Sequence, residues 1–243
     1  MIIRRSVRFA YVSIGVALSI HLGVTPAAAT WSLVAVDART REVGSAGASC
    51  TPFVAGIVAL APGRGAMVAQ AMSNGAARRR GVRLLADGGS PSAIVAAISH
   101  PTFDDTFEEQ QYGVVALGFF DRPAAFTGAR THAGAGHLLA PGVSVQGNTL
   151  AGQDVLTATM EAFTRSAGRP LAERLLVALE AGALRGGDRR CGAQTAQSAY
   201  LVVAAPDDPA GRPRIRHVIP GQSQGGRNPV HLLRRAFTTA GER

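Results

Sequence analysis

The chain has 243 residues, of which 47% are hydrophobic and 17% charged, and its formal net charge is +9. A chain of this length can bury a core without cross-links, and it fits one large domain or two small ones. All 25 basic residues are arginines, because the sequence contains no lysine. This excludes Schiff-base enzymes, Walker-type phosphate-binding loops, protein kinases and Ser-Lys hydrolases.

Residues 1–29 have the order of segments that is typical of a secretory signal peptide. Three arginines among the first eight residues precede an apolar run at residues 9–22, and small residues follow at 27–29. The run is shorter than the roughly 20 residues of a spanning helix, although an uncleaved anchor is the alternative. We therefore expect a periplasmic or secreted bacterial protein that meets the membrane only through this segment, before cleavage.

Cleavage after Ala29 would leave 214 residues with a net charge of +6 and with Thr30 as the first residue. An N-terminal threonine combines a nucleophilic hydroxyl with an α-amine of unperturbed pKa roughly 7.7–8.0, which can act as general base. Threonine is also a common residue, so this position alone is a weak signal.

The remaining chain predicts blocks of strands that alternate with pairs of helices. Residue alternation and turn residues predict the strands, and capping residues predict the helix starts. The expected strands cover residues 31–36, 43–50, 54–61, 65–71, 111–119, 124–127, 143–148, 200–204 and 215–219, and the expected helices cover 76–86, 91–99, 153–163, 170–184 and 230–237. Without a long linker, residues 30–243 are predicted to form a single α+β domain of antiparallel sheets with helices packed outside.

The first two predicted strands place a second hydroxyl beside Thr30. If Val36 pairs with Val43, the same register sets Thr30 opposite Ser49. A shift of one residue would turn the side chains to the other face of the sheet. Ser49 is therefore a candidate for orienting the amine of Thr30.

Several short motifs occur in a fixed order along residues 30–243. They are Thr30-Trp31-Ser32-Leu33-Val34-Ala35-Val36-Asp37, Ala69-Gln70-Ala71, Tyr112-Gly113-Val114-Val115, Ala125-Phe126-Thr127-Gly128, Val145-Gln146-Gly147-Asn148, Gly186-Gly187-Asp188-Arg189-Arg190-Cys191, Gln197-Ser198-Ala199 and Asn228-Pro229-Val230. Together they resemble an uncharacterised bacterial family, the domain-of-unknown-function 1028 family. The sequence departs from that family at residues 131–137, where a Trp-Ala-Gly-His stretch is expected.

This resemblance implies the four-layer αββα sandwich of the N-terminal-nucleophile (Ntn) hydrolases, in which the mature first residue is the nucleophile. The implied reaction is amide hydrolysis, in which the Thr30 hydroxyl attacks and hydrogen-bond donors hold the oxyanion. Asn148 and the amide of Gly147 are the leading donor candidates, and Gln146 and Asn74 are candidates for contacting substrate. Ordinary turn residues at strand ends are the alternative interpretation of these four.

Two cysteines allow one disulfide, between Cys50 and Cys191, and export makes that bond favourable. The bond would bring the loop before Cys191 beside Thr30. Asp188 could then accept a hydrogen bond from the amine, while Arg189 or Arg190 could bind a substrate carboxylate. A purely structural cross-link on a glycine-rich loop is the alternative.

We predict no metal and no cofactor, because His132 and His137 lack the acidic or histidine partners of a zinc motif. The arginines at 78–80 with Arg83 indicate a solvated helix face rather than a nucleic-acid site, since aromatics are only 5%. An anionic envelope polymer is the remaining candidate partner for that face besides a small peptide-like or amide substrate.

Two classes of function follow. The first is an exported N-terminal-threonine amidohydrolase that acts on peptide-like or cell-wall-derived amides. The second is a catalytically silent binding or structural domain of the cell envelope that retains the fold.

Overall fold

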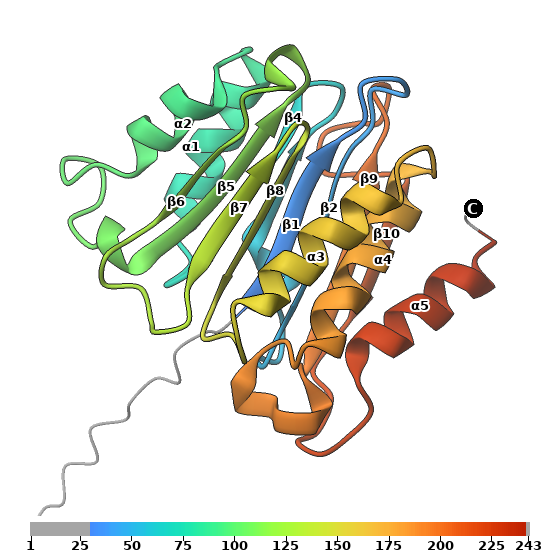
Figure 1. Cartoon of the computed structure of the whole chain (residues 1–243). Helices are drawn as coiled ribbons and strands as arrows, with labels where there is room; N and C mark the ends of the chain where they lie inside the picture. Colours follow the sequence, from blue (N-terminus) through green and yellow to red (C-terminus); the bar gives the residue numbers. More distant parts are fainter. Residues whose placement is uncertain (1–29, 242–243) are drawn as a thin grey trace, which may run out of the picture.

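The structure is a computed structural model, and it describes residues 30–241 (Figure 1). The predicted signal peptide, residues 1–29, lies outside these described residues. The strands are β1 (Thr30–Val36), β2 (Val43–Ser49), β3 (Val58–Ala61), β4 (Gly65–Ala71), β5 (Gln110–Ala116), β6 (Ala124–Thr127), β7 (Gly136–Ala140), β8 (Val143–Asn148), β9 (Ser198–Ala204) and β10 (Ile215–Ile219). The α-helices are α1 (Gly75–Ala86), α2 (Pro91–Ile98), α3 (Asp154–Arg165), α4 (Leu171–Leu184) and α5 (Pro229–Thr239).

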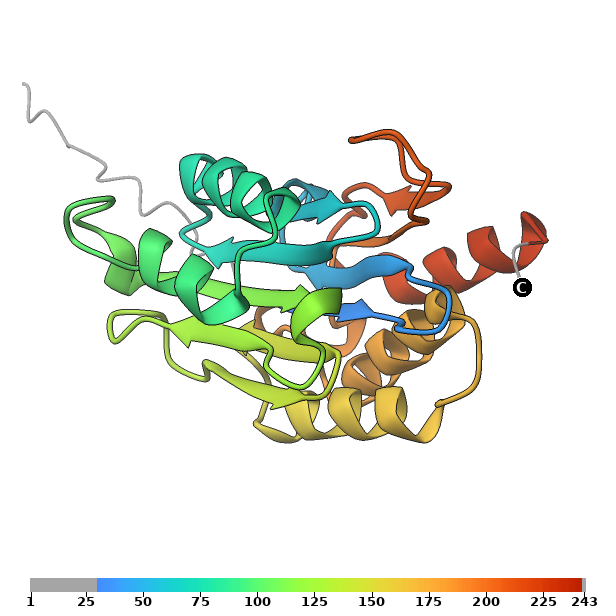
Figure 2. The ribbon, with the colours of Figure 1, turned by 90° about the horizontal axis from the view of Figure 1, so that it is seen from above.

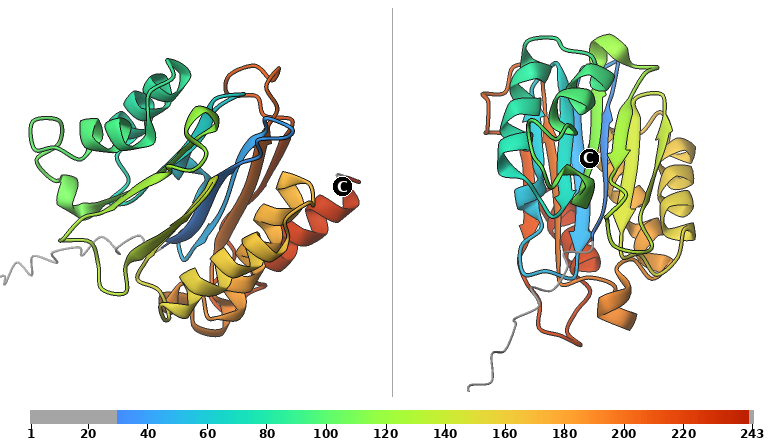
Figure 3. Two further views of the ribbon diagram at one scale, coloured as in Figure 1. Left: turned by 45° about the horizontal axis from the view of Figure 1, so that its top comes forward. Right: turned by 90° about the vertical axis from the view of Figure 1, so that its left-hand side faces the viewer.

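The strands form two antiparallel sheets that pack face to face (Figure 3). The six-stranded sheet has the order β10-β9-β2-β1-β8-β7, and the four-stranded sheet has the order β3-β4-β5-β6. One buried cluster joins the six-stranded sheet to α3, α4 and α5, and another joins the four-stranded sheet to α1 and α2. A third cluster lies between the sheets, so the helices cover the two outer faces (Figure 2). The predicted α+β class is confirmed.

Most predicted elements are confirmed within one or two residues, and the exceptions lie before β3, after β5 and at β7. Residues 55–57 and 117–119 form short 3-10 helices, so the strands predicted there are too long. The strand β7 is absent from the predicted elements. It contains two adjacent leucines, Leu138 and Leu139, and both are exposed. An edge strand with adjacent exposed leucines lacks the alternation from which a strand is recognised.

The predicted register of the first hairpin is confirmed. Val36 pairs with Val43 and Thr30 pairs with Ser49, while on the other edge of β1 Thr30 pairs with Asn148. β1 and β2 are therefore the two central strands of the six-stranded sheet, and Thr30 begins one of them.

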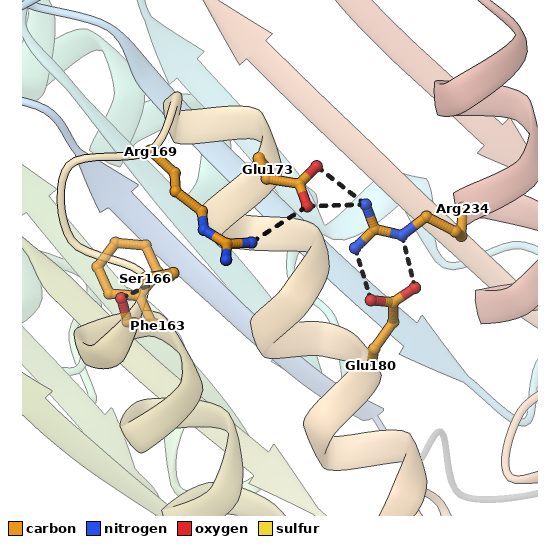
Figure 4. A network of polar contacts seen from close by, with 6 residues as sticks. All are labelled: Phe163, Ser166, Arg169, Glu173, Glu180 and Arg234. Atoms are coloured by element: carbon orange, nitrogen blue, oxygen red, sulfur yellow. Dashed lines mark hydrogen bonds and ion pairs between the residues drawn. The ribbon is translucent and has the colours of Figure 1, made fainter. Parts of the chain in front are cut away.

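A network of ion pairs joins α5 to α4, and Arg169, in the loop between α3 and α4, pairs with Glu173 of the same network (Figure 4). Arg234 of α5 donates to both carboxylate oxygens of Glu180, at 2.8 and 2.6 Å. It also donates to Glu173, which lies nearer the start of the same helix α4, at 2.9 Å. These two carboxylates raise the pKa of Arg234. Bidentate pairs of this kind fix orientation as well as adding stability, so α5 is held in one position against α4.

The layer between the sheets changes from polar to apolar along the strands. On β1 the residues that face this layer are, in order, Thr30, Ser32, Val34 and Val36. The neighbouring strands follow the same gradient: at the Thr30 end the inward residues are Ser49, Gln70, Gln111, Gln146, Asn148 and Ser198, and at the other end they are Val43, Ala66, Val68, Val115, Val202 and Ala204. We call these the polar end and the apolar end.

None of the helices within residues 30–241 is long and apolar enough to cross a membrane.

Candidate active site

Thr30 lies in a row of four polar residues that crosses the polar end of the six-stranded sheet. Ser198 pairs with Ser49, Ser49 with Thr30, and Thr30 with Asn148, on the adjacent strands β9, β2, β1 and β8. Directly opposed residues of antiparallel strands point to the same face, so all four side chains point toward the four-stranded sheet. Each of the four is buried, and Thr30 is 2% exposed.

The hydroxyl of Thr30 contacts the predicted partner. Thr30 Oγ1 donates to Ser49 Oγ at 3.3 Å, and Thr51 Oγ1 donates to the same oxygen at 3.1 Å. The sequence therefore correctly placed Ser49 within reach of Thr30. A role in orienting the amine of Thr30 stays a prediction.

The row contains buried oxygens that lack a hydrogen-bond partner among residues 30–241. Asn148 Oδ1 and Ser198 Oγ are two of these atoms, and the hydroxyl of Thr149, the next residue after Asn148, is a third. Leaving such atoms unpaired costs free energy, and native structures contain few of them. Several gathered around one threonine indicate a place that is built to meet a polar group from outside the chain.

Backbone strain gathers at the same end of the molecule. Ala71 at the end of β4, Thr149 after β8 and Thr195 have φ values of 67°, 51° and 63°. For a β-branched residue such as threonine this left-handed conformation is a genuine outlier. Strained residues of this kind concentrate at functional sites, where the surrounding structure enforces them.

A network of amide side chains supports the row from the opposing sheet. Ser32 Oγ donates to Gln70 Oε1 at 2.6 Å, and Gln70 Nε2 donates to Gln111 Oε1 at 2.8 Å. Gln111 Oε1 also accepts from Asn148 Nδ2 at 3.2 Å, and Gln111 Nε2 donates to the carbonyl of Gly147 at 2.9 Å. Because Gln111 joins both sheets to Asn148, it fixes the side chain that lies beside Thr30.

Sequence reasoning missed the structural roles of Gln70 and Gln111. In the sequence, one feature indicates these roles: each glutamine is a long amide on the inward face of a strand, and the next inward residues of that strand are small or apolar. A buried amide needs partners, but the sequence does not say which strand supplies them.

Gln146, predicted to contact substrate, belongs to the same network. Its Nε2 donates to Ser32 Oγ at 2.8 Å and to the Ser32 carbonyl at 3.0 Å, and its Oε1 accepts from Ser144 Oγ at 2.7 Å. A methyl group added at Gly113 would lie 2.0 Å from Gln146 Oε1, so only glycine at that position of β5 leaves room for the amide. These bonds give Gln146 a supporting place behind Thr30.

The two predicted oxyanion donors differ in their surroundings. Gly147 pairs with Trp31 on one side and with Gly136 on the other, so its backbone lies between two strands. Asn148 ends β8, and its amide nitrogen uses one hydrogen for Gln111. Asn148 is fully buried, and Gln111 is the one partner of its side-chain nitrogen among residues 30–241, which leaves the second hydrogen for another acceptor.

The predicted disulfide between Cys50 and Cys191 is confirmed, with 5.7 Å between the Cα atoms. It joins the residue after β2 to the loop that follows α4. A methyl group at Gly187 of this loop would lie 2.7 Å from the Trp31 ring, which shows how closely the loop covers the start of β1. The loop therefore lies against the start of β1, on the face to which the Trp31 side chain points and opposite the face to which the Thr30 side chain points.

Asp188 is fully buried in this loop, and its carboxylate binds three groups. Oδ2 accepts from the backbone of Cys50 at 2.7 Å and from Arg190 Nη2 at 2.8 Å, and Oδ1 accepts from the backbone and Nε of Arg190, each at 3.1 Å. These bonds fix the loop to the end of β2. The predicted bond from the Thr30 amine to Asp188 stays a prediction.

The two arginines of the loop have different environments. Arg190 is partly buried and paired with Asp188, whereas Arg189 is exposed and its backbone amide donates to the carbonyl of Thr149. Arg189 thus extends into solvent next to the strained residue after Asn148, in a position suited to an incoming carboxylate.

Asn74 serves as a helix cap. Its Oδ1 accepts from the backbone amides of Ala76 and Ala77 at 2.8 and 3.0 Å, and its Nδ2 donates to Asp104 at 2.6 Å. Both ends of the amide are therefore used in starting α1 and in fixing the loop after α2. These contacts give Asn74 a structural role, which favours the alternative interpretation of the Asn-Gly pair over a contact with substrate.

His137 closes the network at the surface. Its Nδ1 lies 2.9 Å from Thr127 Oγ1, which accepts from Gln111 Nε2 at 2.9 Å. Although the residue remains exposed at its outer edge, partial burial lowers the pKa of His137. Among residues 30–241 there is no group of three or more His, Cys, Asp or Glu side chains suited to a metal ion.

Comparisons with known proteins show the family of this chain. A model of the family described as "Family of unknown function (DUF1028)" matches residues 30–217, so the chain belongs to this family. A crystal structure of protein SPO2555 from Silicibacter pomeroyi, assigned to the same family model, is 25% identical and superposes with a TM-score of 0.73 over 88% of this chain and 90% of that one. Among curated proteins none is similar enough to count as a match.

Proposed function

We propose that this protein is an exported amidohydrolase of the N-terminal-nucleophile type, with Thr30 as nucleophile after removal of residues 1–29. The observation that carries the proposal is the place of Thr30: it is the first residue of a central strand, between Ser49 and Asn148. Two facing sheets with helices on both outer faces agree with the four-layer αββα sandwich of that class. The Cys50–Cys191 disulfide supports an oxidising compartment such as the periplasm or the cell exterior.

In the proposed reaction the Thr30 hydroxyl attacks the substrate carbonyl, and its proton passes to the α-amine of the same residue. The amide bond then breaks, the leaving amine takes that proton, and an ester remains on Thr30. Water hydrolyses this ester, which releases a carboxylate product and restores the hydroxyl. Ser49 accepts from the Thr30 hydroxyl before attack, and this bond sets the direction of the oxygen.

The free hydrogen of Asn148 Nδ2 is assigned to the oxyanion, because a preorganised amide stabilises charge that develops during attack. Gln111 keeps this amide in place through the bond at 3.2 Å. Arg189 is assigned to a carboxylate of the substrate, since it is exposed beside Thr149. We expect peptide-like or cell-wall-derived amides as substrates, on the basis of the proposed location.

The proposal is tested by covalent labelling with a β-lactone probe, followed by mapping of the modified residue by tandem mass spectrometry. We expect one label per chain on Thr30, loss of labelling in Thr30→Ala and retention in Thr30→Ser. Thr238→Ala on α5 is the matched control, because its hydroxyl bonds only the preceding turn of that helix. Labelling that survives in Thr30→Ala, or no labelling of the wild type, contradicts the proposal and favours a silent binding domain.

A further inference from the structure

A cavity of about 540 Å³ opens at the edge of the molecule where β3 and α1 face β9 and β10. The loop that joins β9 to β10 lies on the same side of the molecule as α1 (Figure 2). Apolar side chains from β3, α1, β9 and the loop between β9 and β10 form most of the cavity wall, among them Val58, Leu60, Val82, Val202, Pro209 and Pro213. Concave sites that are mostly apolar, with a few polar groups, are typical of small-molecule binding.

Three arginines lie around this apolar wall. Arg64 comes from the turn between β3 and β4, Arg83 from α1 and Arg216 from β10, and all three are exposed. No aspartate or glutamate lines the cavity. Across residues 30–241 none of these three guanidinium groups takes part in an ion pair or a hydrogen bond, so the cavity opening carries unbalanced positive charge.

The cavity is separate from the candidate active site. Ala204, which lines it, pairs with Val43, whereas Ser198 and Ser49 lie at the opposite end of the same two strands. At about 3.3 Å per residue the six residue steps from Ser198 to Ala204 span roughly 20 Å. A ligand in this cavity therefore lies at the apolar end of the layer between the sheets, away from Thr30.

We propose that this cavity binds one small amphipathic anion of the alkyl-carboxylate class, such as a free fatty acid. The volume lies within the roughly 300–1,000 Å³ that is usual for small-molecule sites with a few placed polar groups. The alkyl chain covers the apolar wall, and the carboxylate binds the guanidinium groups of Arg83 and Arg216. Guanidinium–carboxylate pairs are directional and charge-assisted, so the arginines set the orientation of the ligand.

The binding is tested by isothermal titration calorimetry of the purified protein with sodium decanoate and, as a matched uncharged chain, decanol. We expect one decanoate per chain, and binding at least about tenfold tighter than that of decanol, because only the carboxylate engages the arginines. Arg83→Gln combined with Arg216→Gln should remove this difference. Arg235→Gln, an exposed arginine of α5, is the control and should leave decanoate binding unchanged.

A second variant tests the apolar wall independently of charge. Ala86 lies on the exposed side of α1 and lines the cavity, so Ala86→Trp should fill it and abolish binding of both compounds without disturbing the core. Circular dichroism checks that each variant is folded. Absence of decanoate binding, equal affinity for decanol, or a wild-type dimer that Ala86→Trp dissociates would overturn the proposal, the last by assigning the cavity to a second copy of the chain.

Discussion

The polar end and the apolar end of the layer between the sheets are built from the same strands yet hold the sheets together in different ways. At the apolar end, valines and alanines pack without polar atoms, and hydrophobic burial supplies the stability. At the polar end, the same alternate positions carry serines and amides, and several of their hydrogen bonds run from one sheet to the other. Hydrophobic burial and directional hydrogen bonding are therefore concentrated at opposite ends of one layer.

A satisfied polar network is a poor way to gain stability, because desolvation offsets most of each hydrogen bond. Its value lies in direction: each amide has one arrangement that satisfies its neighbours. At this end the network stops at Asn148 and Ser198, whose unpaired oxygens lie around Thr30 and Ser49. The polar end therefore holds a fixed arrangement of groups around a hydroxyl.

The largest expected effect comes from removing the buried charge that fixes the loop before Cys191 to the end of β2. Asp188→Ala removes the buried carboxylate that binds the Arg190 guanidinium and the backbone amide of Cys50, and it should lower the free energy of unfolding by about 3–5 kcal/mol. Urea denaturation with the disulfide intact measures the loss. Asp87→Ala, at the exposed end of α1, should change stability by no more than about 0.5 kcal/mol. A loss below about 1 kcal/mol for Asp188→Ala would mean that this carboxylate does not fix the loop.

A matched pair on β5 compares the two ends directly, because Gln111 and Val115 face the same layer from one strand. Gln111→Leu leaves several buried amides and carbonyls without hydrogen-bond partners and should lower the free energy of unfolding by about 3 kcal/mol. Val115→Ala should lower it by about 2 kcal/mol, because it leaves a small cavity.

The double variant Gln70→Leu with Gln111→Leu sharpens this comparison, since it removes both partners of one hydrogen bond. It should cost less than the sum of the two single variants, because paired apolar groups leave fewer unsatisfied atoms. Additive losses, or a Gln111→Leu variant as stable as the wild type, would show that the polar end does not depend on its network.

The smallest expected effect is a pH dependence at the outer end of the network. Burial lowers the pKa of His137 below the value of 6.5 that it has when unfolded. As the pH falls below 6.5, the unfolded chain takes up a proton that the folded chain resists, so stability falls until the pKa of the folded state is passed. Urea unfolding at pH 7.5 and pH 5 should show a smaller loss in His137→Gln than in the wild type. Equal losses in the two proteins would contradict this coupling.

Local features of the site could be predicted from the sequence, and distant ones could not. The pairing of Thr30 with Ser49 follows from one short hairpin, and the disulfide follows because only two cysteines exist. The contacts of Gln111 depend on how two sheets pack, which residues far apart in the chain decide together. Asn74 illustrates the opposite limit, since an Asn-Gly pair fits both an ordinary turn and a binding residue, and only the structure reveals that Asn74 caps α1.

The account rests on Thr30 being the first residue of the mature protein, and the mature N-terminus is therefore its most direct test. The protein should be recovered after export from an expressing bacterium, and its intact mass and N-terminal sequence should be determined. We predict a single species that begins Thr30-Trp31-Ser32. A mature chain that begins at any other residue would contradict the account, because the α-amine would then be absent from the nucleophile.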